Sequence, residues 1–280
     1  MTSIQGLAPA KLNLFLHITS RRANGYHNLQ TIFQFIDYCD VLEFAYRSDG
    51  QLLYESTAQD LPKEQDLVLR AARLLQQHSN TSKGADIQVV KKIPMGGGLG
   101  GGSSDAATTL LALNKLWQLQ LSPTQLAKLG LHLGADVPVF VHGHAAWAEG
   151  VGESLTPVNL KEPWYLVVNP NCQISTKKIF LAQDLTRDAF PITIREFVAG
   201  RSRNVCEPVV RQLYPQVGQA LDWLAQYNQA RLTGTGACIF AAFETQSQAE
   251  TVLEQLPNQW QGFVAQGKNI SPALKEFTNR

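Results

Sequence analysis

The chain has 280 residues, 44% of them hydrophobic, and its 24 basic and 23 acidic residues give a formal net charge of +1. This length and composition support a well-buried core in two domains, and the charge balance excludes recruitment of nucleic acid or an anionic membrane through overall charge. No apolar run approaches the length of about 20 residues that spans a bilayer. The four cysteines show no C-x-x-C or metal-ligand spacing. We therefore expect reduced thiols in a cytoplasmic protein.

The first predicted element is a strand over residues 11–18, KLNLFLHI. Its alternation places Lys11 and Asn13 on the same face, opposite the leucines. After a turn signal at Asn24 and Gly25, residues 31–37, 41–47 and 51–57 alternate as further strands. Apolar residues then recur at helical spacing over 66–78.

Residues 85–93 predict a strand that leads directly into PMGGGLGGGSS at 94–104, a segment with six glycines. An amphipathic helix follows over about 103–119. Ser103, Ser104 and Asp105 have side chains suited to cap its start. A second helix is expected from Pro123, after Ser122, to about residue 131.

The remaining elements suggest a second domain. A hairpin over 144–160 precedes a polar stretch with proline at 161–163, which we take as the boundary between domains 1–161 and 162–280. Beyond it we expect a strand at 164–169, helices near 176–184 and 208–227, strands flanking the turn TGTGA at 233–237, a helix at 246–256 and a strand at 262–266. This order predicts an α+β sandwich with helices on one face of an antiparallel sheet.

The glycine run between a strand and a helix is typical of a phosphate-binding loop. Its backbone N–H groups and the positive end of the helix dipole can converge on one anion. The loop is not a Walker A motif, because Gly102 stands where that motif has lysine. No acidic residue ends a second strand about 20 residues on, so it is not a Rossmann fingerprint. A flexible linker is the alternative, but linkers rarely enter an amphipathic helix directly.

PMGGGLGGGSSDA resembles the central motif of the GHMP small-molecule kinases, P-x-x-x-G-L-G-S-S. APAKLNLFL at 8–16 and LTGTGACIF at 232–240 match the first and third family motifs in order and spacing. The resemblance implies a ribosomal-protein-like N-terminal domain, a ferredoxin-like α/β sandwich as C-terminal domain, and ATP-dependent phosphorylation of a small-molecule alcohol. Two further motifs narrow the resemblance: RRANGYH, with the R-x-N-G-Y-H pattern at 22–27, and LGADVPVF at 133–140. They imply a family member that acts on the 2-hydroxyl of a cytidylyl-methylerythritol in non-mevalonate isoprenoid synthesis.

The resemblance also implies roles for individual residues. Asp136 matches the catalytic aspartate, which acts as general base, although an aspartate before Val-Pro is also an ordinary helix cap. Lys11 matches the catalytic lysine. Ser103 or Ser104 is expected to contact Mg²⁺. The loop that wraps the phosphates of ATP comprises Pro94, Met95, Gly96, Gly97, Gly98, Leu99, Gly100, Gly101, Gly102, Ser103 and Ser104.

On the substrate side, the resemblance implies a cytidine pocket formed by Tyr26, His27 and Phe180, with Asn13 beside Lys11. Asp66 departs from the family pattern, which has asparagine near the adenine. The other histidines (His17, His78, His132, His142 and His144) have no spacing that indicates a metal.

Three other functions remain open. A kinase of homoserine or mevalonate would share the fold and the loop but would not need the Gly25-Tyr26-His27 turn. A nucleotide sensor without catalysis would not need Lys11 and Asp136 together. Nucleic-acid binding would need a basic stripe, which the charge balance does not provide.

Overall fold

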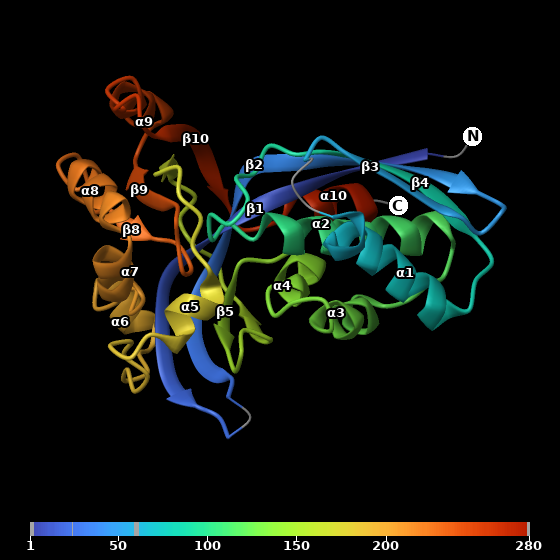
Figure 1. The fold of residues 1–280 in the computed structure, drawn as a ribbon, viewed down its shortest axis with the longest axis horizontal. Coiled ribbons are helices and arrows are strands. Elements are labelled where there is room, and N and C mark those ends of the chain that lie inside the picture. The colour runs from blue at the N-terminus through green and yellow to red at the C-terminus, as the bar shows by residue number, and fades with distance from the viewer. Residues whose placement is uncertain (1–2, 24, 59–61, 279–280) are drawn as a thin grey trace.

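The computed structural model describes residues 3–23, 25–58 and 62–278. Their strands form one ten-stranded sheet with the main order β3-β4-β2-β10-β7-β9-β8 (Figure 1). Helices α1 to α4 lie along one half of the sheet and α6 to α9 along the other. The expected α+β class is confirmed. No helix in these described ranges is long and apolar enough to cross a membrane.

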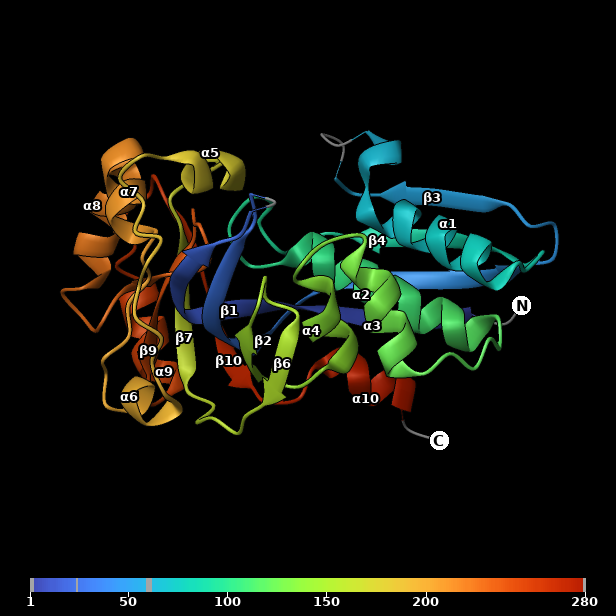
Figure 2. The same cartoon turned by 90° about the horizontal axis from the view of Figure 1, so that it is seen from below.

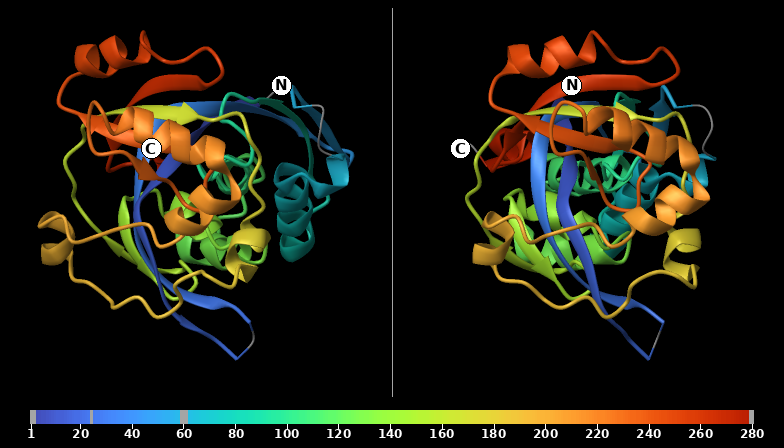
Figure 3. Two further views of the ribbon diagram at one scale, coloured as in Figure 1. Left: turned by 60° about the vertical axis from the view of Figure 1, so that its left-hand side comes forward. Right: turned by 90° about the vertical axis from the view of Figure 1, so that its left-hand side faces the viewer.

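Two long strands, β1 (Ser3–Arg21) and β2 (His27–Arg47), run antiparallel through the whole molecule (Figure 3). The two strands expected at 31–37 and 41–47 are therefore one. The register shifts between Pro9 and Ala10, and again between Asn13 and Leu16, and such bulges bend a strand. Asn24 of the expected turn lies outside the described residues, while Gly25 has the positive φ, +85°, that favours glycine.

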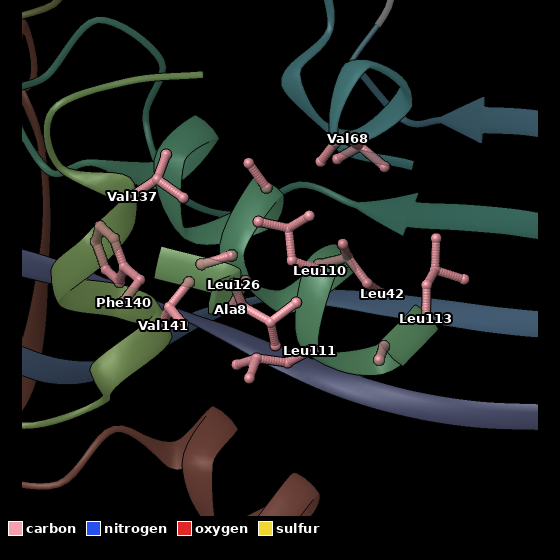
Figure 4. Close-up of a cluster of buried hydrophobic side chains, with 14 of the residues drawn as sticks. Ala8, Leu42, Val68, Leu110, Leu111, Leu113, Leu126, Val137, Phe140 and Val141 are labelled. Carbon is pink, nitrogen blue, oxygen red and sulfur yellow. The ribbon is translucent and has the colours of Figure 1, made fainter. Parts of the chain in front are cut away.

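The first half of the sheet adds β3 (Leu52–Ser56), β4 (Gly84–Val90) and the hairpin β5 (Ala146–Glu149) with β6 (Ser154–Pro157). A short 3-10 turn, η1 (Lys63–Gln65), precedes the helices. The helices of this half are α1 (Leu67–Ser79), α2 (Gly101–Leu116), α3 (Pro123–Leu131) and α4 (Val137–His142). Buried aliphatic residues of α2 and α4 meet those of the strands in one core, as Figure 4 shows.

The expected capping of α2 is wrong. The helix begins at Gly101, and its N-cap is Gly100 in the left-handed conformation. Ser104 and Asp105 are already inside the helix and buried. The glycines let the chain enter the helix earlier than the polar residues suggest, and those side chains then point inward.

The second half contains β7 (Trp164–Asn169), β8 (Arg231–Leu232), β9 (Ile239–Phe243) and β10 (Gln261–Lys268). Its helices are α5 (Thr176–Leu181), α6 (Ile194–Val198), α7 (Glu207–Leu213), α8 (Pro215–Leu224) and α9 (Gln246–Leu253). The single helix expected over 208–227 is divided at Tyr214. Pro215 disfavours helical backbone at the residue before it, which explains the break.

The final helix, α10 (Pro272–Thr278), returns to the first half and packs against β1 and α2 (Figure 2). A Cβ on Gly6 would lie 2.9 Å from the Phe277 ring, so glycine permits the close approach of α10. The boundary at residues 161 and 162 stays a prediction, and α10 is a segment of the second range that packs on the first.

Candidate active site

A cleft of 440 Å³ opens where the two halves meet. Its wall combines the glycine loop, the start of α2 and Asp136 from the first half with Thr176, Phe180 and the turn at Gly234 from the second. In Figure 1 the chain before α2 lies in the middle of the molecule, between the two groups of helices. Segments far apart in the sequence therefore contribute to one site.

The glycine loop is fixed through its carbonyl oxygens. Four successive carbonyls accept hydrogen bonds from protein donors: Gly96 from Ala237 N at 3.3 Å, Gly97 from Cys238 N at 3.1 Å, Gly98 from Lys11 Nζ at 3.0 Å and Leu99 from Lys11 N at 2.9 Å. The negative ends of these peptide dipoles are thus turned toward protein. Together with the N-terminus of α2, which lines the cleft, the loop suits an anion.

Two glycines of this loop combine a positive φ with too little space for a side chain. Gly98 has φ of +75°, and a Cβ there would lie 2.3 Å from the carbonyl oxygen of Thr233. Gly100 has φ of +73°, and its Cβ would lie 2.9 Å from the Phe140 ring. Gly98 is therefore a point of close contact between the loop and the turn of the second half, and a side chain at this position would separate them.

Lys11 and Asp136 form an ion pair beside this loop. Their Nζ and Oδ2 atoms are 3.3 Å apart, with the lysine side chain 4% exposed and the aspartate 34% exposed. Asp136 precedes α4 but makes no capping hydrogen bond with its side chain. The helix-cap interpretation therefore does not account for this carboxylate, which faces the cleft beside the lysine.

Asn13 links Lys11 to both halves of the molecule. Its Oδ1 accepts a hydrogen bond from Lys11 Nζ, and its Nδ2 donates to Thr31 Oγ1 at 3.0 Å. Its backbone N–H donates to Thr233 Oγ1 at 3.0 Å. Asn13 lines the cleft, and these bonds orient the lysine.

The two serines after the loop occupy different environments. Ser103 lines the cleft, whereas Ser104 is fully buried and its Oγ has no hydrogen-bond partner among the described residues. Within the same ranges, no group of three His, Cys, Asp or Glu residues is arranged to hold a metal. Ser103 is a hard oxygen donor on the cleft wall, which fits Mg²⁺ because this ion takes few protein ligands and completes its shell with phosphates and water.

The residues expected at the base pocket come only partly together. The rings of His27 and Phe180 stack with centroids 5.2 Å apart, and Phe180 lines the cleft. Tyr26 is 65% exposed and is not part of the cleft wall. Burial and the nearby charge of Arg187 lower the pKa of His27, and its Nε2 is buried without a hydrogen-bond partner in the described structure.

Asp66, which also lines the cleft, is occupied by protein contacts. Its Oδ1 accepts from Val68 N at 2.8 Å and so caps α1, while Oδ2 accepts from the Tyr54 hydroxyl at 2.5 Å. A carboxylate has no amide donor, so this position does not supply the amide contact that asparagine would.

Some cleft residues were missed in the sequence. Thr235 lines the wall and shares a hydrogen bond with Thr176 at 3.0 Å, and Lys91 lies at the end of β4 beside the loop. The TGTGA turn was a signal for Thr235. Lys91 is one of two adjacent lysines at the end of the predicted strand, and only the structure shows which of them turns inward.

Comparison with known proteins agrees with this geometry. Residues 66–144 match the model of the GHMP kinases N terminal domain, and residues 189–262 match that of the GHMP kinases C terminal. A 4-diphosphocytidyl-2-C-methyl-D-erythritol kinase of Nitrosococcus oceani is 61% identical over 95% of this chain and 95% of its own. One of Alkalilimnicola ehrlichii is 57% identical over 95% and 92%.

Solved structures give the same result. A crystal structure of 4-(cytidine 5'-diphospho)-2C-methyl-D-erythritol kinase superposes with a TM-score of 0.83 at 29% identity, covering 94% of this chain and 99% of that one. Homoserine kinase from Cytophaga hutchinsonii superposes with a TM-score of 0.72 at 16% identity, over 95% of each chain, and shows the fold alone. This chain belongs to the GHMP kinase family.

Proposed function

We propose that this protein uses ATP to phosphorylate the 2-hydroxyl of 4-diphosphocytidyl-2-C-methyl-D-erythritol in non-mevalonate isoprenoid synthesis. The observation that carries the chemistry is the ion pair of Lys11 and Asp136, with Nζ and Oδ2 at 3.3 Å, beside a glycine loop whose carbonyls are turned toward protein. The choice of alcohol rests on the relatives at 61% and 57% identity, which carry that enzyme's name.

In this proposal the carboxylate of Asp136 accepts the proton of the substrate hydroxyl as the hydroxyl oxygen bonds to the γ-phosphorus of ATP, while the bond from that phosphorus to the β-phosphate oxygen breaks and ADP leaves. Lys11 forms an ion pair with the aspartate and places positive charge near the transferred group. The lysine is held for this task by Asn13 Oδ1 and the Gly98 carbonyl. The positive end of α2 stabilises the phosphates of ATP.

Phosphoryl transfer from ATP uses Mg²⁺, which neutralises charge on the phosphate oxygens. Ser103 would supply a protein oxygen for this ion, and phosphate oxygens and water would complete its shell. Ser103 is preferred to Ser104 because Ser103 lines the cleft and Ser104 is buried.

The cytidine end of the substrate is assigned to the side of the cleft at Phe180 and His27. A stacked aromatic pair offers a face for a base, and the unpartnered Nε2 of His27 offers a hydrogen bond. Tyr26, on the adjacent turn, is proposed to cover the base when it binds. A cytoplasmic location goes with this proposal, because ATP is supplied there and all four cysteines are free thiols.

The test is ATP consumption with Mg²⁺ and three alcohols: the cytidylyl substrate, homoserine and mevalonate. We expect turnover with the cytidylyl substrate alone. Turnover of another alcohol would keep the kinase and reject the substrate. Nucleotide binding without turnover of any alcohol would favour a sensor, although a sensor would not need the Lys11–Asp136 pair.

A further inference from the structure

Three titratable residues, the buried Asp40 and Asp105 and the partly buried Lys91, join the two ends of the glycine loop. Asp40 lies on β2, Lys91 follows β4 just before the loop, and Asp105 lies in α2 just after it. Lys91 Nζ donates to Asp40 Oδ2 and, at 2.5 Å, to Asp105 Oδ2. The side chains are 14% exposed or less. One lysine thus bridges a strand of the sheet and the first turns of the helix.

Asp40 also holds the chain that enters the loop. Its Oδ1 accepts hydrogen bonds from the backbone N–H groups of Lys92 at 2.5 Å and Ile93 at 2.8 Å. A Cβ on Gly101 would lie 3.6 Å from Asp40 Oδ2, so the start of α2 passes close to the same carboxylate. Both ends of the segment 94–100 are therefore attached to one point of the sheet.

We infer that the side chains of Asp40, Lys91 and Asp105 position the glycine loop for the nucleotide. We call these three side chains the clamp. Asp40 and Asp105 are positioning residues, which act through the loop backbone. This inference rests on the proposed function, in that the loop's ligand is the phosphate chain of ATP.

The environment of the clamp favours the protonated forms of Asp105 and Lys91. Burial raises the pKa of Asp105 to about 8, with Asp40 adding to the shift against the opposing effect of Lys91. Burial alone would lower the pKa of Lys91, but the two carboxylates outweigh it and raise that pKa. Asparagine imitates a neutral carboxylic acid in shape and as an acceptor.

The test compares Asp105→Ala with Asp105→Asn in the full chain. Hydrogen exchange of residues 94–104 is measured without ligand, and the Kd of Mg²⁺ with the ATP analogue AMP-PNP is measured by calorimetry. We expect Asp105→Ala to accelerate exchange and raise the Kd about 10-fold, the effect of losing a buried hydrogen bond to a charged group. Asp105→Asn should recover most of both. The KM of the alcohol should change less than about twofold in either variant, because the clamp does not touch that side of the cleft.

Asp40→Ala should have a larger effect, since it releases both Lys91 and the backbone of 92–93. If it does not fold, the Asp105 pair still decides the question. Asp86→Ala is the matched control, because Asp86 lies on β4 but pairs with Arg47 at the surface. Unchanged exchange and Kd in Asp105→Ala would overturn the clamp. A wild-type protein that does not bind AMP-PNP would instead contradict the proposed function, while the exchange data would still judge the clamp.

Discussion

The two sides of the cleft are built differently. On the phosphate side, the glycine loop is fixed by four carbonyl hydrogen bonds and by a buried ionic cluster at its ends. On the side of Phe180, His27 Nε2 is buried and has no hydrogen-bond partner in the described structure. Tyr26, on the same side, is 65% exposed. The loop on the phosphate side is held in place by protein contacts before a ligand binds. On the other side, His27 Nε2 still lacks a hydrogen bond that a ligand could make. Mutations on the two sides should therefore affect different substrates.

The largest effect on activity is expected for Asp136, which lies on the cleft wall beside Lys11. Asp136→Asn should lower kcat by about 10² or more, because a general base contributes about that much, and should leave AMP-PNP affinity within about threefold. Steady-state kinetics and calorimetry measure the two quantities. Near-normal turnover would remove Asp136 from the mechanism.

Gly98→Ala should weaken ATP binding and leave binding of the alcohol unchanged. The new Cβ would lie 2.3 Å from Thr233 O at a φ of +75°, so the loop must move away from the second half. We expect KM for ATP to rise about 10-fold or more, with about 1–2 kcal/mol lost in stability from the left-handed backbone alone.

Gly102→Ala is the matched control in the same loop. Its Cβ would lie 3.5 Å from Leu67, an ordinary contact, and its φ is not positive. Equal losses in the two variants would show that a clash with Thr233 is not the cause of the loss in Gly98→Ala.

Phe180→Ala should weaken binding of the cytidylyl substrate. Aromatic stacking on a base contributes about 1–3 kcal/mol, so the KM of the cytidylyl substrate should rise about 10-fold while KM for ATP stays unchanged. His27→Ala should do the same to a smaller extent through its hydrogen bond. An equal rise in both KM values would place Phe180 in the general fold instead of the base pocket.

The smallest effect is an opposite response to pH of two segments, the glycine loop and the segment 189–193 beside His17. Burial lowers the pKa of His17, whose ring nitrogen Nδ1 lies 3.2 Å from the Phe190 carbonyl oxygen, so its stabilisation is present above pH 6.5 and is lost as pH falls through the lowered value. The pKa of Asp105 is raised to about 8, so its stabilisation is lost as pH rises toward 8. The charged or titratable neighbours are Arg203 for His17, and Lys91, Asp40 and Tyr54 for Asp105.

Hydrogen exchange at pH 5.5, 7 and 9, corrected for intrinsic rates, measures this response. We expect faster opening at residues 189–193 in acid and at 94–104 in alkali, each by a factor of about 10 or less. The same direction of change in both segments would contradict the assignment.

The sequence predicted elements where pattern and local chemistry agree. The strand at 164–169, the helix capped by Ser122 and the alignment of Lys11 with Asn13 are all confirmed. The start of α2 was wrong, because six glycines allow several helix starts and polar side chains can turn inward as well as cap.

The contacts between distant segments could not be predicted. Gly98 meets Thr233 across 135 residues, and Asp40 meets the chain at 92–93 across about 50, pairings that no local pattern encodes. The second role of Asp66, as acceptor from Tyr54, likewise depends on how β3 lies beside α1. Motif spacing indicated which residues belong to the site but not which of them are already bonded to protein.

The most direct test of the central claim is the identity of the product. Phosphorus NMR should follow the wild-type protein with ATP, Mg²⁺ and the cytidylyl substrate. We predict one new phosphomonoester signal that grows as the γ-phosphate of ATP disappears, while the diphosphate of the substrate remains intact. Release of inorganic phosphate without a phosphomonoester, or cleavage of that diphosphate, would contradict phosphoryl transfer to the alcohol.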